Sequence, residues 1–295
     1  MSSGDLTADR RFAYAQMLRK DGDFAAAAEV LAQALELAPR WAEGTFTLAE
    51  TLVEAGRKYD AVPVFEHYLE LDPADSMGAA VKLALLTEAK PSAMPLAYIE
   101  RLFDEYAPRF EKALLEKLHY RAPQLIKEAL DECAPGRRFV RAFDLGCGTG
   151  LAGLALRDRA AWLGGVDLSA AMVKGARDKN IYDALIVGDM TQALRELAEP
   201  CDLIAAADVM TYVGDLAGVF AAVHEKIMPD GLFVFTLQRH DGDGYVLGVE
   251  HRFSHSRTYI ESVAGGFEAL KIDDAVSRRE RGEDVPGLIA VFRKY

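Results

Sequence analysis

Cysteine is scarce in this sequence, and long apolar runs are absent. The three cysteines, Cys133, Cys147 and Cys201, lie far apart and show no paired spacing. Neither a disulfide framework nor a zinc cluster is therefore expected, and this cysteine use is typical of a reducing compartment such as the cytoplasm. No apolar stretch reaches the length of about 18 residues that indicates a transmembrane helix, so we expect no membrane span.

Positive charge is also in short supply. Lysine and arginine number 34 against 46 aspartates and glutamates, which gives a formal net charge of -12 at pH 7. That charge disfavours broad binding to nucleic acid or to an anionic membrane, and we expect neither as a partner. Apolar residues make up 51% of the 295 residues, so a substantial core is expected, and the length suggests two domains.

The first third of the sequence repeats itself with a period of 34 residues. Four landmarks recur at that distance: Gly22, Ala27, Leu31 and Pro39 correspond to Gly56, Ala61, Phe65 and Pro73. This period is typical of the tetratricopeptide repeat, a helix–turn–helix unit in which small residues let paired helices approach. We therefore expect an all-α repeat domain over residues 1–92. It is expected to bind a protein partner or a second copy of the chain.

The pattern changes after Lys90-Pro91-Ser92, which we take as the domain boundary. Residues 93–135 are expected to form a helical lid or linker, with helices near Leu96–Tyr106 and Pro108–Cys133. From residue 136 to residue 295, short apolar runs alternate with helical stretches. This alternation predicts an α/β domain with a Rossmann-like, mostly parallel, doubly wound sheet.

Seven apolar runs are candidate strands of that sheet. Five of them are separated by helical stretches and are expected to be parallel: Phe139–Leu145, Trp162–Val166, Ala184–Val187, Leu203–Ala207 and Leu232–Thr236. Two later runs, Leu270–Ile272 and Gly287–Phe292, are expected to form an antiparallel pair at the edge.

A glycine-rich turn follows the first expected strand. Residues 143–150 read FDLGCGTG, and glycines there allow positive φ and let a ligand lie against bare backbone. A dinucleotide fingerprint GxGxxG also begins at Gly148, with acidic Asp167 about 20 residues further on. An NAD(P)-linked oxidoreductase is therefore an alternative. Asp144 argues against it, because its carboxylate would meet a pyrophosphate of the same sign, whereas the ammonium group of S-adenosylmethionine suits it.

Acidic residues end the next two expected strands. Asp167 can accept hydrogen bonds from both hydroxyls of a ribose, although a carboxylate at a helix N-terminus is an alternative role. Ser169 is the better placed helix cap. Gly188-Asp189-Met190 ends the third strand, where the carboxylate could accept from an adenine amino group while the methionine covers the ring. A simple strand-ending turn explains that segment equally well.

Together these spacings resemble the class I S-adenosylmethionine-dependent methyltransferases over about residues 96–295. The whole chain resembles a bacterial subgroup that fuses tetratricopeptide repeats to this domain. The resemblance implies S-adenosylmethionine as cofactor and these residues around it: Asp144, Gly146, Gly148, Asp167, Leu168, Met172, Gly188, Asp189, Met190 and Asp208. It also implies a lid in which Tyr106 and Phe110 close over the cofactor and Arg121 pairs with its methionine carboxylate. Packing against the repeats is the alternative role of that lid.

The resemblance also narrows the acceptor of the methyl group. Ala207–Val213 lacks the Asn/Asp-Pro-Pro-Tyr signature of the family's amino-methylating DNA enzymes, and a Pro-Cys nucleophile for cytosine is absent. A small molecule or a protein side chain is therefore the expected acceptor. A repeat scaffold with a vestigial cofactor domain is the remaining alternative, but the intact glycine turn and its acidic partners argue against lost cofactor binding.

The segment after the fifth expected strand is where this fold often builds its acceptor pocket. Arg252, His255 and Tyr259 resemble a signature of the repeat-fused subgroup, and we expect them to be the catalytic residues. His255 could remove a proton from the acceptor near neutral pH, or it could cap the following helix. His251 and His255 have the spacing of two ligands on one helical face, but no third ligand follows, so no metal is expected.

Overall fold

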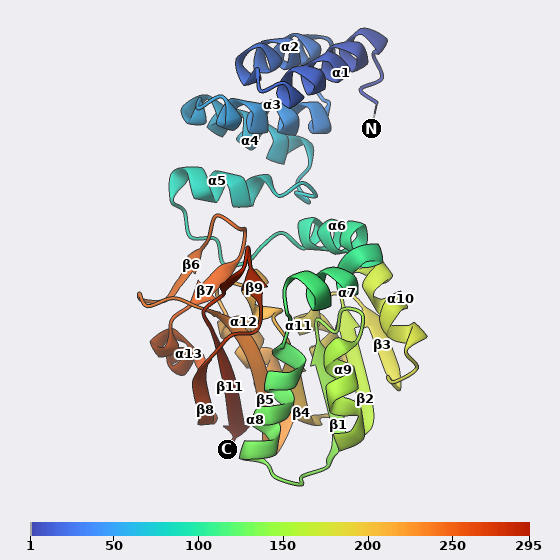
Figure 1. Cartoon of the computed structure of the whole chain (residues 1–295), viewed down its shortest axis with the longest axis vertical. Helices are drawn as coiled ribbons and strands as arrows, with labels where there is room; N and C mark the ends of the chain where they lie inside the picture. Colours follow the sequence, from blue (N-terminus) through green and yellow to red (C-terminus); the bar gives the residue numbers. More distant parts are fainter. Residues whose placement is uncertain (1) are drawn as a thin grey trace. The chain divides into compact units, whose positions relative to one another are not determined.

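The computed structural model describes residues 2–295 and divides into two compact units, Met1–Pro91 and Ser92–Tyr295. The N-terminal unit is all-α (Figure 1). Its helices are α1 (Leu6–Lys20), α2 (Phe24–Leu37), α3 (Ala42–Glu54), α4 (Lys58–Leu71) and α5 (Ala79–Thr87). The side chains predicted to pack between paired helices are fully buried: Ala27, Leu31, Ala61 and Phe65. Gly22 and Gly56 have φ values of 81° and 77° in the turns, which favours glycine at both positions.

The C-terminal unit is built on a doubly wound sheet with the strand order β3-β2-β1-β4-β5-β11-β8. The first five strands are parallel: β1 (Phe139–Leu145), β2 (Ala160–Asp167), β3 (Ala184–Val187), β4 (Cys201–Ala206) and β5 (Ile227–Arg239). The two late strands, β8 (Phe267–Ala275) and β11 (Gly287–Lys294), pair antiparallel as predicted. β11 lies between β5 and β8 and is antiparallel to both.

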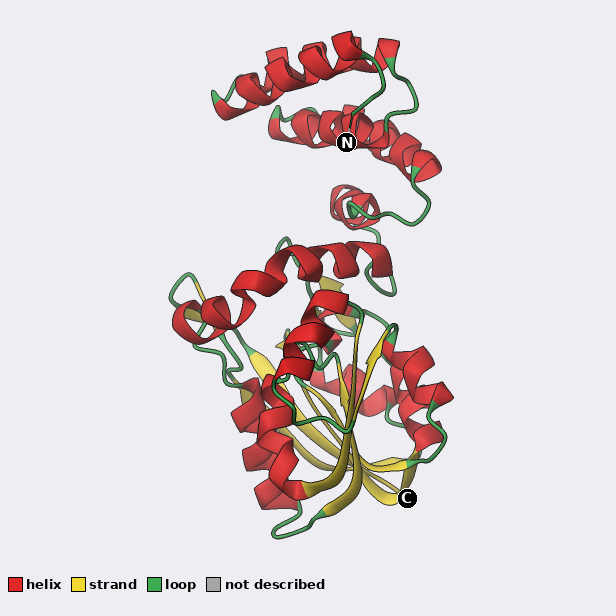
Figure 2. Cartoon of the chain, turned by 90° about the vertical axis from the view of Figure 1, so that its right-hand side faces the viewer, coloured by secondary structure: helices red, strands yellow, loops and turns green. Residues whose placement is uncertain are grey.

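Helices cover both faces of this sheet (Figure 2). On one face lie α8 (Ala122–Cys133) and α9 (Leu151–Leu156), and on the other α11 (Met190–Glu196), α12 (Ala217–Lys226) and α13 (Arg257–Val263). β1 supplies both cores, because Ala142 packs on one side while Phe143 and Leu145 pack on the other. Burial on both faces explains why these strands read as nearly continuous apolar runs.

Two smaller elements extend the sheet after β5. Strands β6 (Tyr245–Leu247) and β7 (Phe253–His255) form an antiparallel pair. β7 also pairs in parallel with the last residues of β5. A short hairpin, β9 (Arg279–Glu280) with β10 (Glu283–Asp284), follows β8. No helix within residues 2–295 has both the length and the apolar character that crossing a membrane requires.

A helical segment precedes β1 and belongs to the same unit. It starts with α6 (Leu96–Tyr106), a 3₁₀ turn (Ala107–Arg109), the single turn α7 (Phe110–Lys112) and a π-helical turn (Ala113–Lys117). The chain enters α6 through a short pairing, in which Ala93 bridges Val213 and the Ser92 carbonyl accepts from the Gly214 amide at 2.8 Å. These contacts fix the start of the helical segment above the carboxyl end of β4.

Candidate active site

A cavity of about 340 Å³ lies between the carboxyl ends of the parallel strands and the helical segment. The strand ends contribute Gly146, Gly148, Asp167, Leu168, Gly188, Asp189, Met190 and Asp208 to its lining. The helical segment contributes Leu96, Ile99, Phe103, Tyr106, Phe110, Leu114 and Tyr120. Ligands of open α/β sheets bind at this position, in the crevice outside the carboxyl ends of the strands. Eight of the residues that were predicted to bind the cofactor from the sheet thus share one cavity, and Tyr106 of the lid joins them.

The glycine turn brings bare backbone to the cavity. Gly146 has φ 62°, and a Cβ atom there would lie 2.5 Å from Cγ2 of Val209. Gly148 has φ 52°, and a Cβ atom would lie 3.5 Å from the Phe110 ring. The Gly148 amide donates to Oδ2 of Asp167 at 2.9 Å, so this hydrogen bond joins the turn after β1 to the end of β2.

Asp144 lies beneath this turn rather than in the cavity wall. Its side chain is fully buried, and the Tyr182 hydroxyl donates to Oδ2 at 2.6 Å. The other oxygen, Oδ1, has no hydrogen-bond partner among the residues that the structure describes. Burial raises the pKa of this carboxyl to about 7. The site therefore contains a buried acid with one free acceptor.

Asp167 and Asp189 both line the cavity, but they are held differently. Oδ1 of Asp167 accepts from the Ser169 amide and Oδ2 from the Gly148 amide, each at 2.9 Å, and burial raises its pKa. Ser169, and not Asp167, caps the following helix α10 (Ala170–Asp178). Asp189 caps α11 through Oδ1, so the strand-ending turn suggested for this segment is present. Asp189 also lines the cavity.

Besides Asp144, two other residues predicted to bind the cofactor do not line the cavity. Met172 is 1% exposed and does not line the cavity. Arg121 stands at the start of α8 with its guanidinium 3.7 Å from Glu128, and its side chain is 58% exposed. Arg121 therefore does not line the cavity in this structure, because the turn before α8 directs its side chain towards solvent.

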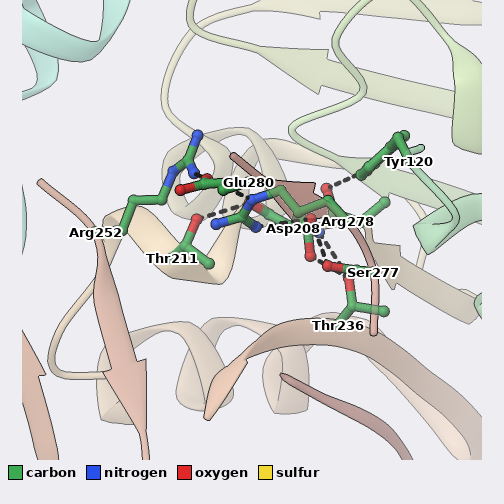
Figure 3. Close-up of polar contacts among 9 residues, drawn as sticks. Tyr120, Asp208, Thr211, Thr236, Arg252, Ser277, Arg278 and Glu280 are labelled. Atoms are coloured by element: carbon green, nitrogen blue, oxygen red, sulfur yellow. Dashed lines mark hydrogen bonds and ion pairs between the residues drawn. The ribbon is translucent and has the colours of Figure 1, made fainter. Parts of the chain in front are cut away.

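The side chain of Asp208 is held by three donors (Figure 3). Oδ1 accepts from the Thr236 hydroxyl at 2.9 Å, and Oδ2 accepts from the Ser277 hydroxyl at 2.9 Å and from Nη1 of Arg278 at 3.2 Å. The backbone of Asp208 is left-handed, with φ 56°, directly after β4. Asp208 thus lines the cavity, and its carboxylate positions an arginine.

That arginine was not predicted from the sequence. Arg278 is 3% exposed, lines the cavity and donates from Nε to Glu280 at 3.0 Å. Arg252, which was predicted, also lines the cavity and bonds to the same carboxylate oxygen of Glu280. The only signal in the sequence is the charged run Ser277–Arg281, which is typical of an exposed loop.

His255 and Tyr259 lie outside the cavity lining. His255 is fully buried on β7, and its Nε2 is 2.9 Å from the Val213 carbonyl and 3.0 Å from the Gly214 carbonyl. Burial lowers the pKa of this histidine to about 4, so the neutral ring donates from Nε2. The Tyr259 hydroxyl donates to Asp215 at 2.9 Å. Both side chains therefore hold the loop after β4.

Neither suggested role of His255 matches this geometry. Ser256 is the residue that caps α13, by accepting from the Tyr259 amide at 3.1 Å. His251 lies in a turn with φ 57° and His255 in a strand, so the two do not share a helical face. Within residues 2–295, no three histidine, cysteine or acidic side chains are grouped to hold a metal ion.

Comparisons with known proteins agree with this architecture. The family model of a methyltransferase domain matches residues 143–235, and a tetratricopeptide-repeat model matches residues 18–85. Within the C-terminal unit, residues 143–235 are thus similar to a methyltransferase domain, and within the N-terminal unit residues 18–85 are similar to tetratricopeptide repeats.

Curated relatives match part of this chain. A malonyl-(acyl-carrier protein) O-methyltransferase from Salmonella typhimurium is 29% identical over 118 residues, which are 40% of this chain and 47% of the relative. A ubiquinone biosynthesis O-methyltransferase from Xylella fastidiosa is 35% identical over 104 residues, 34% of this chain and 42% of the relative. The chain thus spans less than half the length of these two relatives.

Solved structures share the fold of the methyltransferase domain. Magnesium protoporphyrin IX methyltransferase from Synechocystis, with bound S-adenosylmethionine, superposes with a TM-score of 0.52 at 14% identity, covering 68% of this chain and 97% of the other. An N-methyltransferase from Bradyrhizobium japonicum, in complex with S-adenosylhomocysteine, gives 0.51 at 17% identity, with coverage of 66% and 97%. The fold is that of S-adenosylmethionine-dependent methyltransferases.

Proposed function

We propose that this protein transfers the methyl group of S-adenosylmethionine to a small molecule or to a protein side chain. The observation that carries the proposal is the arrangement of the glycine turn, Asp167 and Asp189 at the ends of neighbouring strands around one cavity. Glycines admit a ligand to the backbone, and the two carboxylates offer acceptors for its hydroxyl and amino groups.

The residues present fit this cofactor. Asp167 has its two oxygens fixed by backbone amides and would accept from the ribose hydroxyls. Asp189 and Met190 would hold the adenine. Oδ1 of Asp144 is buried without a partner in residues 2–295, and an ammonium group is a ligand that such an oxygen accepts. The backbone of Gly146 and Gly148 lines the cavity, and the methionine moiety would lie beside it.

The contribution of the protein to catalysis would be position and shielding. When bound, the cofactor supplies an electrophilic methyl group on a sulfonium, which transfers by an in-line displacement. The aromatic and aliphatic side chains of the helical segment exclude water from the cavity, which favours a reaction between a held donor and a held acceptor. Because His255 is buried and neutral away from the cavity, no base is assigned to it.

Several features support an acceptor other than a nucleic acid. The net charge of -12 opposes contact with a phosphate backbone, and the cavity wall near the helical segment is mostly apolar. All three cysteines are free thiols, which fits the cytoplasm. The repeats would bind a protein partner or a second copy of the chain, as helical repeat surfaces commonly do.

Calorimetry with S-adenosylhomocysteine tests the cofactor assignment. We expect binding by the whole chain, and in Asp167→Ala we expect a weaker affinity, by about tenfold or more. Each lost hydrogen bond to a charged group contributes about 1.5–3 kcal/mol. Asp243→Ala is the matched control, because Asp243 is exposed in the loop after β5 and lies outside the cavity lining.

Two results would count against the proposal. One is a folded protein without affinity for S-adenosylhomocysteine. The other is binding of NADH at this site in place of S-adenosylhomocysteine, which would favour the dinucleotide fingerprint that begins at Gly148.

A further inference from the structure

The two ends of the cavity differ in chemistry. The end below β2 and β3 presents the carboxylates of Asp167 and Asp189, which the cofactor would use. The opposite end lies beyond β4 and presents two guanidinium groups, those of Arg252 and Arg278. Because the adenosine part of the proposed cofactor would lie at the first end, the basic groups of the second end are available to another ligand.

Two of the three guanidinium nitrogens of Arg278 have a hydrogen-bond acceptor, and the third has none among the described residues. Nη1 donates to Asp208 at 3.2 Å and Nε to Glu280 at 3.0 Å, while Nη2 has no hydrogen-bond partner in the part of the chain that the structure describes. The side chain is 3% exposed. A buried guanidinium nitrogen without an acceptor is unfavourable, and native proteins rarely leave one unexplained.

The surrounding contacts hold this nitrogen in place. Asp208 is itself fixed by Thr236 and Ser277, so the arginine that it holds cannot easily turn away. Glu280 is shared between Arg278 and Arg252, so a single carboxylate serves both guanidinium groups. The network in Figure 3 therefore prepares N–H donors for an anionic acceptor atom that is absent from the protein itself.

We propose that Arg278, supported by Arg252, binds a carboxylate of the methyl acceptor, while the apolar helical segment binds the rest of that molecule. The proposal depends on the proposed function, because the second substrate is the acceptor of that reaction. The one guanidinium nitrogen of Arg278 without an acceptor, Nη2, is a charged donor, and it binds an anionic carboxylate more strongly than a neutral hydroxyl or amine. Leu114, Leu118 and Tyr120 line the same cavity, so an apolar or aromatic body adjacent to the carboxylate is favoured.

The test uses the whole chain saturated with S-adenosylhomocysteine. Calorimetry compares 4-phenylbutanoate with its neutral isostere 4-phenylbutanamide as probes of the second subsite. We expect the carboxylate to bind about tenfold more tightly, because charge-assisted hydrogen bonds are roughly twice as strong as neutral ones. Arg278→Met should abolish that preference and keep the affinity for S-adenosylhomocysteine. Arg279→Met is the matched control, since Arg279 is exposed, pairs with Asp284 and lies outside this cavity.

Three outcomes would overturn the inference. Equal affinity for the two probes in the unmodified chain would do so without any variant, even if Arg278→Met failed to fold. A preference retained in both Arg278→Met and Arg278→Lys would place the anion elsewhere. Arg278→Met that loses affinity for S-adenosylhomocysteine, but not for 5′-methylthioadenosine, would show that the arginine binds the cofactor's own carboxylate. Absence of S-adenosylhomocysteine binding in the unmodified chain would instead contradict the proposed function.

Discussion

Three aspartates at the carboxyl ends of neighbouring strands have different hydrogen-bond partners. Asp208 is surrounded by two hydroxyl groups and a guanidinium, and Asp167 by two backbone amides. Asp144 receives one phenolic hydrogen bond from Tyr182 and is otherwise desolvated. Burial disfavours the charged form of Asp144 and raises its pKa to about 7, so the protonation of this carboxyl changes near neutral pH.

This difference predicts how stability depends on pH. Asp144 has a pKa of about 7 in the folded protein, against 3.8 as its ordinary value. Between these values the folded state binds a proton that the unfolded state does not, so stability falls as the pH rises through this window. The slope that Asp144 contributes is at most about 1.4 kcal/mol for each pH unit. Asp144→Asn cannot ionise, and it should therefore lose this contribution.

Urea unfolding of the ligand-free chain between pH 5 and pH 8 measures the contribution of Asp144 to the pH dependence of stability. The free energy of unfolding should decline less steeply with pH in Asp144→Asn than in the parent, while Asp243→Asn should follow the parent. Parallel curves for all three proteins would show that Asp144 does not titrate in this range.

The location of a single residue in the cavity could be predicted where that residue ends an apolar strand. Asp167 and Asp189 end apolar runs, and parallel strands end at one edge of a sheet, so the sequence predicts them together in the cavity. Arg278 could not be predicted, because its burial depends on Asp208, which lies 70 residues earlier in the sequence. His255 illustrates the opposite error. A histidine among polar residues suggests catalysis, but here it donates to the carbonyls of a loop from another part of the chain.

At the scale of elements, the glycine turn after β1 is a constrained connection. Gly146→Ala would place a methyl group against Val209, at 2.5 Å, in a left-handed backbone that disfavours alanine. We expect this substitution to destabilise the protein by about 1–3 kcal/mol or to abolish binding of S-adenosylhomocysteine. Thermal unfolding and calorimetry measure the two effects.

Gly218→Ala is the matched control for that substitution. Gly218 lies inside α12, where an added Cβ would meet no atom within 4 Å. Alanine is the better helix former by about 1 kcal/mol, so this variant should be at least as stable as the parent. Equal loss of stability in Gly146→Ala and Gly218→Ala would show that the turn has no special constraint.

Long elements were predictable and short ones were not. The five parallel strands and the antiparallel pair follow from apolar runs, which are continuous because the sheet is covered on both faces. β6, β7, β9 and β10 have two or three residues each, too few for any periodicity. The helical segment was predicted as two helices, but its middle is divided into a 3₁₀ turn and a π-helical turn around residues 107–117.

At the scale of the whole molecule, each unit has its own hydrophobic core. The N-terminal core is formed by the repeat landmarks and their neighbours, including Leu31 and Phe65. The C-terminal cores lie on the two faces of the sheet. The 34-residue period and the alternation of strands and helices are local in sequence, which explains why both fold classes could be predicted from the sequence alone.

This organisation predicts that the C-terminal unit binds the proposed cofactor without the repeats, provided that the chain is cut at the right residue. All residues that line the cavity lie at position 93 or later. Ser92, Ala93 and Met94 also belong to this domain, because they pair with the loop after β4: the Ser92 carbonyl accepts from two amides and the Met94 amide donates to the Tyr212 carbonyl at 3.1 Å. A chain that begins at Ser92 should therefore bind S-adenosylhomocysteine within about threefold of the whole chain.

A chain that begins at Leu96 is the informative comparison. It keeps α6 but loses the pairing between Ala93 and Val213, so the helical segment is tied to the sheet by fewer contacts. Because that segment forms one wall of the cavity, we expect weaker cofactor binding and a lower melting temperature than for the chain from Ser92. Calorimetry and thermal unfolding of the two shortened chains, beside the whole protein, decide the matter. If the chain from Ser92 folds but does not bind S-adenosylhomocysteine, the repeats contribute to the cofactor site, and the functional division between the two units is wrong.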